Sequence, residues 1–358
     1  NGHWVFEQPV HASKEFAFTV VERSGEPIVR FAGPFASESD FLARSGDLAE
    51  VPANEFATWS DVAAFPLMPD SGSATVFRRM QESPMFDSMR PGWDFRLTNE
   101  LHSTNDAELY DFDLAGATGV PIYKGESFNH WEPDSGIYYA RADAAELRKH
   151  LLRKLSTQTR QARSPYFGLD FAGGLPMDRP RIAFRKITSN TNQRTCVSAL
   201  IPGHVSATEG CQVVLRADAS AAAEAFLLGV LSSIPFDWAA RRWVEINFNF
   251  YVMKSLPVPV YEPGTLLADR AVHVAGSLAA VDGRYREWAA EIGVEVGTAK
   301  EEPVKSDLIA ELDALVSLLY GLTEEQVRHL FATFHRGWDY QGRLNAVLAH
   351  YARWKEVA

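Results

Sequence analysis

The chain has 358 residues, 46% of them hydrophobic and 23% charged, which is typical of a globular protein of about two domains. This composition excludes disordered and collagen-like classes, and no stretch approaches the roughly 20 consecutive apolar residues that cross a bilayer. The first ten residues lack the basic and apolar regions of a secretion signal, so we expect a cytoplasmic protein with no membrane partner. The two cysteines, Cys196 and Cys211, cannot form a zinc cluster alone, and we expect two buried thiols.

The charge is distributed unevenly along the chain. The formal net charge is −11, and residues 1–120 hold 8 Lys and Arg against 19 Asp and Glu. Residues 121–358 therefore hold 27 residues of each sign and are neutral on average. The net charge argues against a simple nucleic-acid binder, but locally basic segments remain after the first third.

Short apolar runs and one basic helix are expected in the first half. The runs Phe16–Val21 and Pro27–Phe31, bounded by turn residues, predict short strands, and no long helix is expected before residue 120. From Ala140 to Arg163 the pattern becomes helical, because leucines recur every four residues at 147, 151 and 155. Residues 141–163 carry a net charge of +5, which gives this helix a basic stripe.

The middle of the chain predicts a strand pair and a buried helix. Arg181–Lys186 and Cys196–Ile201 are typical of strands and flank the polar loop Thr188–Thr195. Ala219–Trp243 is apolar on most sides and predicts a buried helix. The prolines in Leu256–Val260 exclude a helix there and indicate an extended linker leaving the domain.

The C-terminal third is predicted to be helical. Leucines at 308, 312, 315 and 319 form one stripe that ends at Gly321, and Thr323 with Gln326 forms a capping box for the next helix. A further helix carries Leu344, Val347 and Tyr351. We therefore expect an α+β protein, with a mixed α/β unit of short strands and loops over 1–260 and a helical unit over 261–358.

The common enzyme signatures are absent. The sequence contains no Gly-x-x-x-x-Gly-Lys-Ser/Thr, Gly-x-Gly-x-x-Gly, Gly-x-Ser-x-Gly or His-Glu-x-x-His motif. The glycine-rich run Phe171–Gly174 precedes a proline, which favours a turn over a phosphate-binding loop.

The segment Arg179–Arg194 is the most informative one. It holds five Lys and Arg and no acid, together with Asn190, Asn192 and Gln193. Lysine and arginine can contact phosphates and guanine, and asparagine and glutamine match the donor and acceptor pair of adenine. The loop can therefore be a DNA-reading loop or a solvated hairpin with an internal side-chain network, and composition alone leaves both open.

The same segment, Phe184-Arg-Lys-Ile-Thr and Asn192-Gln-Arg-Thr195, resembles a signature in the C-terminal half of type IIG adenine-specific DNA methyltransferases and related phage-defence methyltransferases. The resemblance covers roughly residues 90–355. Further segments resemble segments of this family in the same order along the chain: Leu97–Asp106, the turn Val120–Gly125, the helix from Leu231 to Arg242, the corner Phe248–Tyr251, the linker Leu256–Pro259 and the segments Ala310–Leu315 and Leu319–Leu322. Around Gly125 the family's acidic and basic positions are exchanged.

The resemblance implies the target-recognition portion of such an enzyme. The family's catalytic half binds S-adenosylmethionine and uses an Asn/Asp-Pro-Pro-Tyr/Phe tetrapeptide, and this chain contains no Pro-Pro. We therefore expect double-stranded DNA as partner, no cofactor in this chain, and a methyltransferase domain or separate catalytic subunit elsewhere. The alternatives are a protein-interaction scaffold of a phage-defence complex and a hydrolase that uses Asp and His. The expected phosphate contacts are Lys149, Arg153, Lys154 and Arg160, and the expected contacts near bases or backbone are Arg185, Lys186, Asn190, Asn192, Gln193, Arg194 and Asn249.

Overall fold

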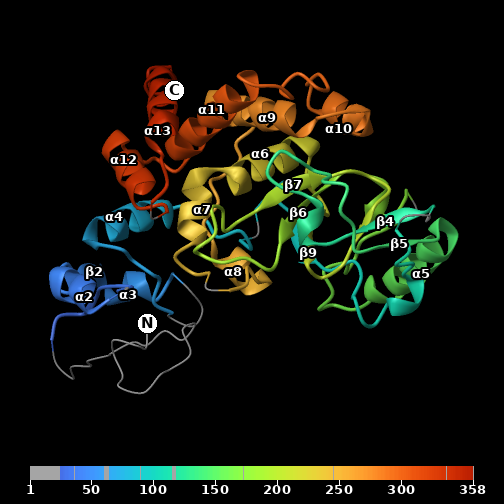
Figure 1. Ribbon diagram of the computed structural model, residues 1–358, viewed down its shortest axis with the longest axis horizontal. Helices are drawn as coiled ribbons and strands as arrows, with labels where there is room; N and C mark the ends of the chain where they lie inside the picture. The colour runs from blue at the N-terminus through green and yellow to red at the C-terminus, as the bar shows by residue number, and fades with distance from the viewer. Residues whose placement is uncertain are drawn as a thin grey trace.

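The computed structural model describes residues 25–357 except 36, 60–63, 89, 115–117, 172, 245 and 336. The predicted strand Phe16–Val21 lies outside the described residues. The described part is an α+β protein with small sheets and many helices, as the sequence predicted (Figure 1).

The elements follow one another in this order along the chain. The strands are β1 (Ile28–Phe31), β2 (Ala49–Pro52), β3 (Phe95–Thr98), β4 (Val120–Tyr123), β5 (Ala140–Ala142), β6 (Arg181–Arg185), β7 (Ser198–Ile201), β8 (Ser206–Ala207) and β9 (Cys211–Arg216). The helices are α2 (Glu38–Arg44), α3 (Ala53–Phe56), α4 (Ser71–Met80), α5 (Ala144–Gln158), α6 (Ala221–Ser232), α7 (Ile234–Ala240), α8 (Phe250–Ser255), α9 (Leu266–Ala279), α10 (Arg286–Glu291), α11 (Val304–Leu319), α12 (Glu324–Ala332) and α13 (Gln341–Lys355).

A four-stranded antiparallel sheet forms the centre, in the order β3-β9-β6-β7. Successive residues of β6 serve different cores, as alternation along a strand requires. Phe184 belongs to the large hydrophobic cluster that includes α6, whereas Ala183 packs with Tyr123 and Phe128 on the other side. Both predicted strands of this region, β6 and β7, are confirmed, and the polar loop connects them.

A second sheet, β5-β4-β8, carries the basic helix α5. Leu147, Leu151 and Leu155 of α5 are buried in a separate small cluster with Ile122 of β4, which confirms the predicted apolar stripe. The helix begins later than predicted, because 140–142 form β5 and the Asp143 carboxylate caps the first turn.

The buried helix predicted over 219–243 is two helices. Ser233 ends α6 and caps α7, where its hydroxyl accepts the N–H of Phe236, and Pro235 stands in the first turn of α7. Both helices are buried on nearly all sides, as the sequence predicted.

The C-terminal helices have the predicted start and stop signals. Gly321 adopts φ +66° after Tyr320, the residue that ends α11, and the Thr323 and Gln326 side chains form the predicted capping box of α12. These helices share one hydrophobic cluster with α4, α6 and α7, so the expected boundary at residue 260 does not separate two cores.

The segment Leu256–Val258 is extended as predicted, but it is not an exit linker. Leu256 and Val258 are fully buried. The Leu256 carbonyl accepts the N–H of Phe86 at 2.8 Å, and the Val258 N–H donates to the Pro84 carbonyl at 2.9 Å. This pairing partner stands far away in the sequence, which is why the local pattern showed the extended conformation but not its burial.

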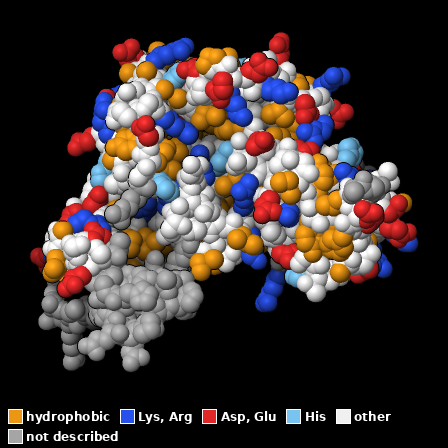
Figure 2. Space-filling view, in the orientation of Figure 1, with side chains coloured by type: hydrophobic (Ala, Val, Ile, Leu, Met, Phe, Trp, Pro, Cys, Tyr) orange, Lys and Arg blue, Asp and Glu red, His pale blue; other side chains and the backbone are white. Residues whose placement is uncertain are grey.

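The described N-terminal part contains elements that the sequence analysis did not predict, namely α2, β2, α3 and α4. The longest of them, the ten-residue helix α4, is capped by Asp70 and buries Val76, Phe77 and Met80. Strand β1 confirms the strand predicted at 27–31. On the face shown in Figure 2, basic and acidic side chains are interspersed over the C-terminal helices and form no single large patch of one sign there.

Candidate nucleic-acid interface

The loop between β6 and β7 is anchored by one fully buried carboxylate. Asp237 of α7 accepts the backbone N–H groups of Thr195 at 3.0 Å and Cys196 at 2.9 Å. It also accepts the Nε–H of Arg194 at 2.5 Å. Hydrogen bonds to an ionised group are stronger than neutral ones, so the C-terminal end of the loop is held firmly.

The rest of the loop is held by Arg241, one turn further along the chain from Asp237. Its guanidinium donates to the carbonyl of Asn190 at 2.9 Å and to those of Asn192 and Gln193 at 2.6 Å. The guanidinium lies 4.1 Å from the ring centroid of Phe334, and burial lowers the pKa of Arg241 below its usual value. Most hydrogen bonds of the Arg241 guanidinium are therefore donated to backbone carbonyls and not to carboxylates.

The anchoring leaves the amide side chains of the loop outside. Thr191, Asn192 and Gln193 are exposed and Asn190 is partly exposed, while their backbone carbonyls face inward to Arg241 and to His335, whose Nε2 lies 3.0 Å from the Thr191 carbonyl. The sequence left open whether the loop is a reader or a hairpin with an internal network. The described geometry has a hydrogen-bond network on the backbone side, and on the exposed side the Asn192 amide donates to the Thr188 hydroxyl at 3.4 Å.

Arg194 does not lie with the exposed amides. Its guanidinium is taken up by Asp237 and by the carbonyls of Ser232 at 2.7 Å and Ser233 at 3.1 Å, and its side chain is 17% exposed. Arg194 thus anchors the loop in this conformation, and its expected contact near bases or backbone stays a prediction.

Two segments that the sequence analysis named separately lie side by side. The Thr188 N–H donates to the Ile246 carbonyl at 3.2 Å, and the Phe248 N–H donates to the Lys186 carbonyl at 2.8 Å. Asn249 follows at the start of α8, where its side chain caps no helical N–H. Lys186 and Asn249, both expected near DNA, are therefore close to the β6–β7 loop and partly exposed.

Arg185 is more confined than expected. Its guanidinium donates to the Phe128 carbonyl and lies 5.8 Å from the Phe128 ring centroid, and burial lowers its pKa. Lys124 in the neighbouring turn is paired with Glu126 at 2.6 Å, so the exchanged charges around Gly125 neutralise each other.

The expected phosphate contacts on α5 are placed apart from the loop. Lys149 and Arg153 are exposed, and so is Arg160, which follows the end of the helix. Lys154 is different, because its Nζ donates to the Glu100 carbonyl at 2.7 Å. In Figure 1, α5 lies beside β4 and β5, at a distance from α7 and α8, so the structure does not bring the stripe and the loop into one cluster.

The two residues that anchor the loop were not predicted from the sequence. Neither Asp237 nor Arg241 was singled out as a functional residue. The spacing of four residues between Asp237 and Arg241 indicated that both side chains lie on one helix face. Their partners stand more than 40 residues away in the sequence, which no local pattern shows.

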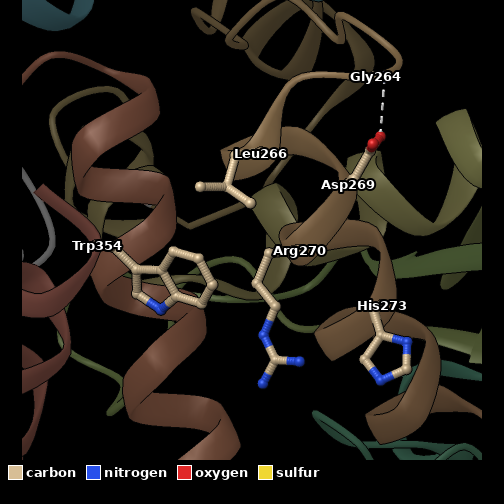
Figure 3. Close-up of a pocket in the computed structure, with 6 residues that line it drawn as sticks. All are labelled: Gly264, Leu266, Asp269, Arg270, His273 and Trp354. Carbon is tan, nitrogen blue, oxygen red and sulfur yellow. Dashed lines mark hydrogen bonds between the residues drawn. The ribbon is translucent and has the colours of Figure 1, made fainter. Parts of the chain in front are cut away.

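Two surface cavities lie outside the β6–β7 loop. One, of about 450 Å³, lies between α9 and α13, where the Arg270 and Trp354 side chains converge (Figure 3). Arg270 is paired with Glu311 at 2.7 Å, and Asp269 accepts the N–H of Gly264. The other, of about 480 Å³, lies between residues 90–93, 218–220 and 260–263. In the second cavity the Ser220 hydroxyl caps α6 by accepting the N–H of Ala223.

The described residues were also searched for metal sites and membrane spans, and the chain was compared with known proteins. Among the described residues, no group of three or more His, Cys, Asp or Glu is placed to hold a metal ion. None of the described helices has both the length and the hydropathy of a transmembrane segment. The chain matches no protein-family model and no curated protein. Both cysteines are buried free thiols, as predicted.

Proposed function

We propose that this chain is the sequence-specific, double-stranded DNA recognition portion of an adenine-N6 DNA methyltransferase. The observation that supports this most is the anchored β6–β7 loop, in which Asp237 and Arg241 hold the backbone while Asn190, Asn192 and Gln193 face solvent. Readout of base edges needs amide and guanidinium groups in fixed positions, because bidentate hydrogen bonds tolerate little misplacement.

The proposal divides the work between two surfaces. The loop, with Lys186 and Asn249 beside it, contacts base edges and the nearby backbone. The exposed cations Lys149, Arg153 and Arg160 contact phosphates, which fix position without reading sequence. Arg194 and Lys154 support the surfaces from behind, since both are occupied within the protein.

Methyl transfer itself belongs to a methyltransferase domain or catalytic subunit that binds S-adenosylmethionine. That partner receives the target adenine after it leaves the stack, because its amine is unreachable inside a duplex. The proposal assigns no cofactor to the described residues.

Duplex binding tests the proposal directly. Fluorescence anisotropy of the purified chain with a labelled random-sequence duplex should show binding that weakens steeply between about 50 and 200 mM salt, because binding releases counterions. Single-stranded DNA of the same length is the control and should bind more weakly. Absence of duplex binding at the low salt concentration overturns the proposal.

An exposed aromatic cluster favours a second function, a protein-interaction scaffold. The rings of Tyr110 and Phe112 pack against Tyr139 with centroids 5.3 and 5.6 Å away, and Phe112 is 60% exposed between the exposed acids Asp111 and Asp113. Exposed aromatic residues are enriched at protein interfaces. The salt titration separates the two functions, since a scaffold has no salt-dependent affinity for duplex DNA.

A further inference from the structure

An exposed isoleucine stands beside the loop on a rigid backbone. Ile187 is 74% exposed. Its backbone is fixed on both sides, because the carbonyl of Lys186 accepts the Phe248 N–H and the N–H of Thr188 donates to the Ile246 carbonyl. Ile187 itself forms an antiparallel bridge with Asn247. A β-branched side chain on such a backbone has few rotamers to lose on binding.

Ile187 and Asn247 face the same side of the bridge. Directly opposed residues of an antiparallel pair share one face, and their neighbours point the other way. Of their neighbours, Thr188 and Phe248 are buried and Ile246 is 58% exposed, so the opposite side holds buried side chains, whereas the face of Ile187 and Asn247 holds none. Asn247 is partly exposed.

These two side chains match one base pair in the major groove. The 5-methyl group of thymine is the one apolar group that base edges present there, and adenine offers the N6 donor and N7 acceptor that an asparagine amide satisfies together. A two-stranded antiparallel ribbon fits into the major groove. An exposed isoleucine gains free energy only where it meets an apolar partner.

We infer that Ile187 and Asn247 together read an A·T base pair, with Ile187 against the thymine methyl group and the Asn247 amide on adenine N6 and N7. This inference rests on the proposed function and deepens it, because it states which base pair the outer face prefers.

Base analogues test each contact separately. Preferred duplexes are first selected from a random library with the purified chain, and each thymine in the selected duplex is then replaced by uracil, which lacks the methyl group. Replacement at one position should weaken binding about fourfold, the factor for roughly 0.8 kcal/mol of one buried methyl-sized group. The variant Ile187→Ala should bind the thymine and uracil duplexes equally. Replacement of the paired adenine by 7-deazaadenine, which lacks N7, should cost about tenfold in the wild type and nothing further in Asn247→Ala.

The matched control is Ile246→Ala. Ile246 is also exposed, at 58%, but lies on the other side of the bridge by alternation, so this variant should keep the fourfold discrimination. Thermal unfolding should be unchanged in Ile187→Ala, because its side chain is exposed. If Ile187→Ala still discriminates thymine from uracil, or if selection returns no preferred A·T pair, the inference is wrong while DNA binding stands. Absence of any duplex binding removes the proposed function and this inference together.

Discussion

Asp237 of α7 and Arg241, the residue that follows this helix, bind opposite groups of the same loop. Asp237 accepts backbone N–H groups at residues 195 and 196, and Arg241 donates to the carbonyls of residues 190, 192 and 193. The two side chains are 3.9 Å apart at their nearest ionic atoms. A fully buried helix thus fixes a loop whose side chains reach solvent.

Removing the buried charge should destabilise the protein strongly. In Asp237→Asn the guanidinium groups of Arg194 and Arg241 remain without their anion, so we expect the free energy of unfolding to fall by about 3–5 kcal/mol. Urea denaturation at neutral pH measures the change. Asp87→Asn is the control, because Asp87 pairs with Lys254 at 3.0 Å on the exposed surface and should cost about 0–1 kcal/mol. Equal losses in the two variants contradict the anchoring role of Asp237.

Arg194 should behave as an anchor and not as a base reader. We expect Arg194→Ala to lower the free energy of unfolding by on the order of 3 kcal/mol, because the buried Asp237 carboxylate loses its main cation. Binding to a preferred and to a random duplex should weaken by the same factor. A selective loss on the preferred duplex restores the base contact that the sequence predicted.

Local patterns could be predicted from the sequence because their causes are local. The leucine stripe of α5 and the capping box of α12 each depend on residues within one or two helical turns, and both are present. The break at Ser233 had a local signal too, since a serine followed two residues later by proline is a common helix start, but the apolar run concealed it.

The wrong expectations concern partners that are distant in the sequence. The polar residues of the β6–β7 loop were singled out, yet the sequence could not show which of them the protein itself occupies. Arg194 and Asn192 are equally polar, and only the position of Asp237 behind the loop separates an anchor from an exposed amide. The burial of Leu256 depends in the same way on Phe86.

The C-terminal helices should be needed for the fold. A chain that ends at Tyr261 exposes α6 and α7, whose buried faces lie in the cluster shared with α9 and α11. We therefore expect no cooperative unfolding transition by near-ultraviolet circular dichroism. A chain that ends at Lys355 loses only exposed residues of the described part and should unfold as the full chain does. A cooperative transition in the shorter chain contradicts the shared core.

Glu224 should make stability depend on pH. It is fully buried in α6, and burial raises its pKa from 4.5 to about 7, although Arg216 lies 3.6 Å away. The folded state therefore binds the proton more tightly than the unfolded state. The stabilisation is complete below pH 4.5 and is lost as the pH rises to about 7, with a total of about 3 kcal/mol.

Glu224→Gln should remove this part of the pH dependence, because its amide does not titrate and can still accept from Trp288. Glu291→Gln is the control, since Glu291 approaches the same arginine from a 54% exposed position. Urea denaturation at several pH values between about 4.5 and 7 measures the slopes. If Glu224→Gln keeps the wild-type slope, another group carries the pH dependence.

The two proposed DNA-contacting surfaces should respond differently to salt. Arg153 of α5 is exposed, so Arg153→Ala should weaken binding to all duplexes by a similar factor and lower the salt slope by about one per lost phosphate contact. Asn192→Ala should leave the slope unchanged, because an uncharged side chain releases no counterion. Asn192→Ala should weaken the binding free energy by roughly 1–3 kcal/mol on the preferred duplex and by less on random duplexes.

Lys154→Ala is the matched control for the helix, since Lys154 donates to the Glu100 carbonyl and its loss should affect stability rather than the salt slope. If the salt slope of Arg153→Ala is unchanged, Arg153 contacts no phosphate and this face of α5 is solvent-exposed surface without a role in DNA binding.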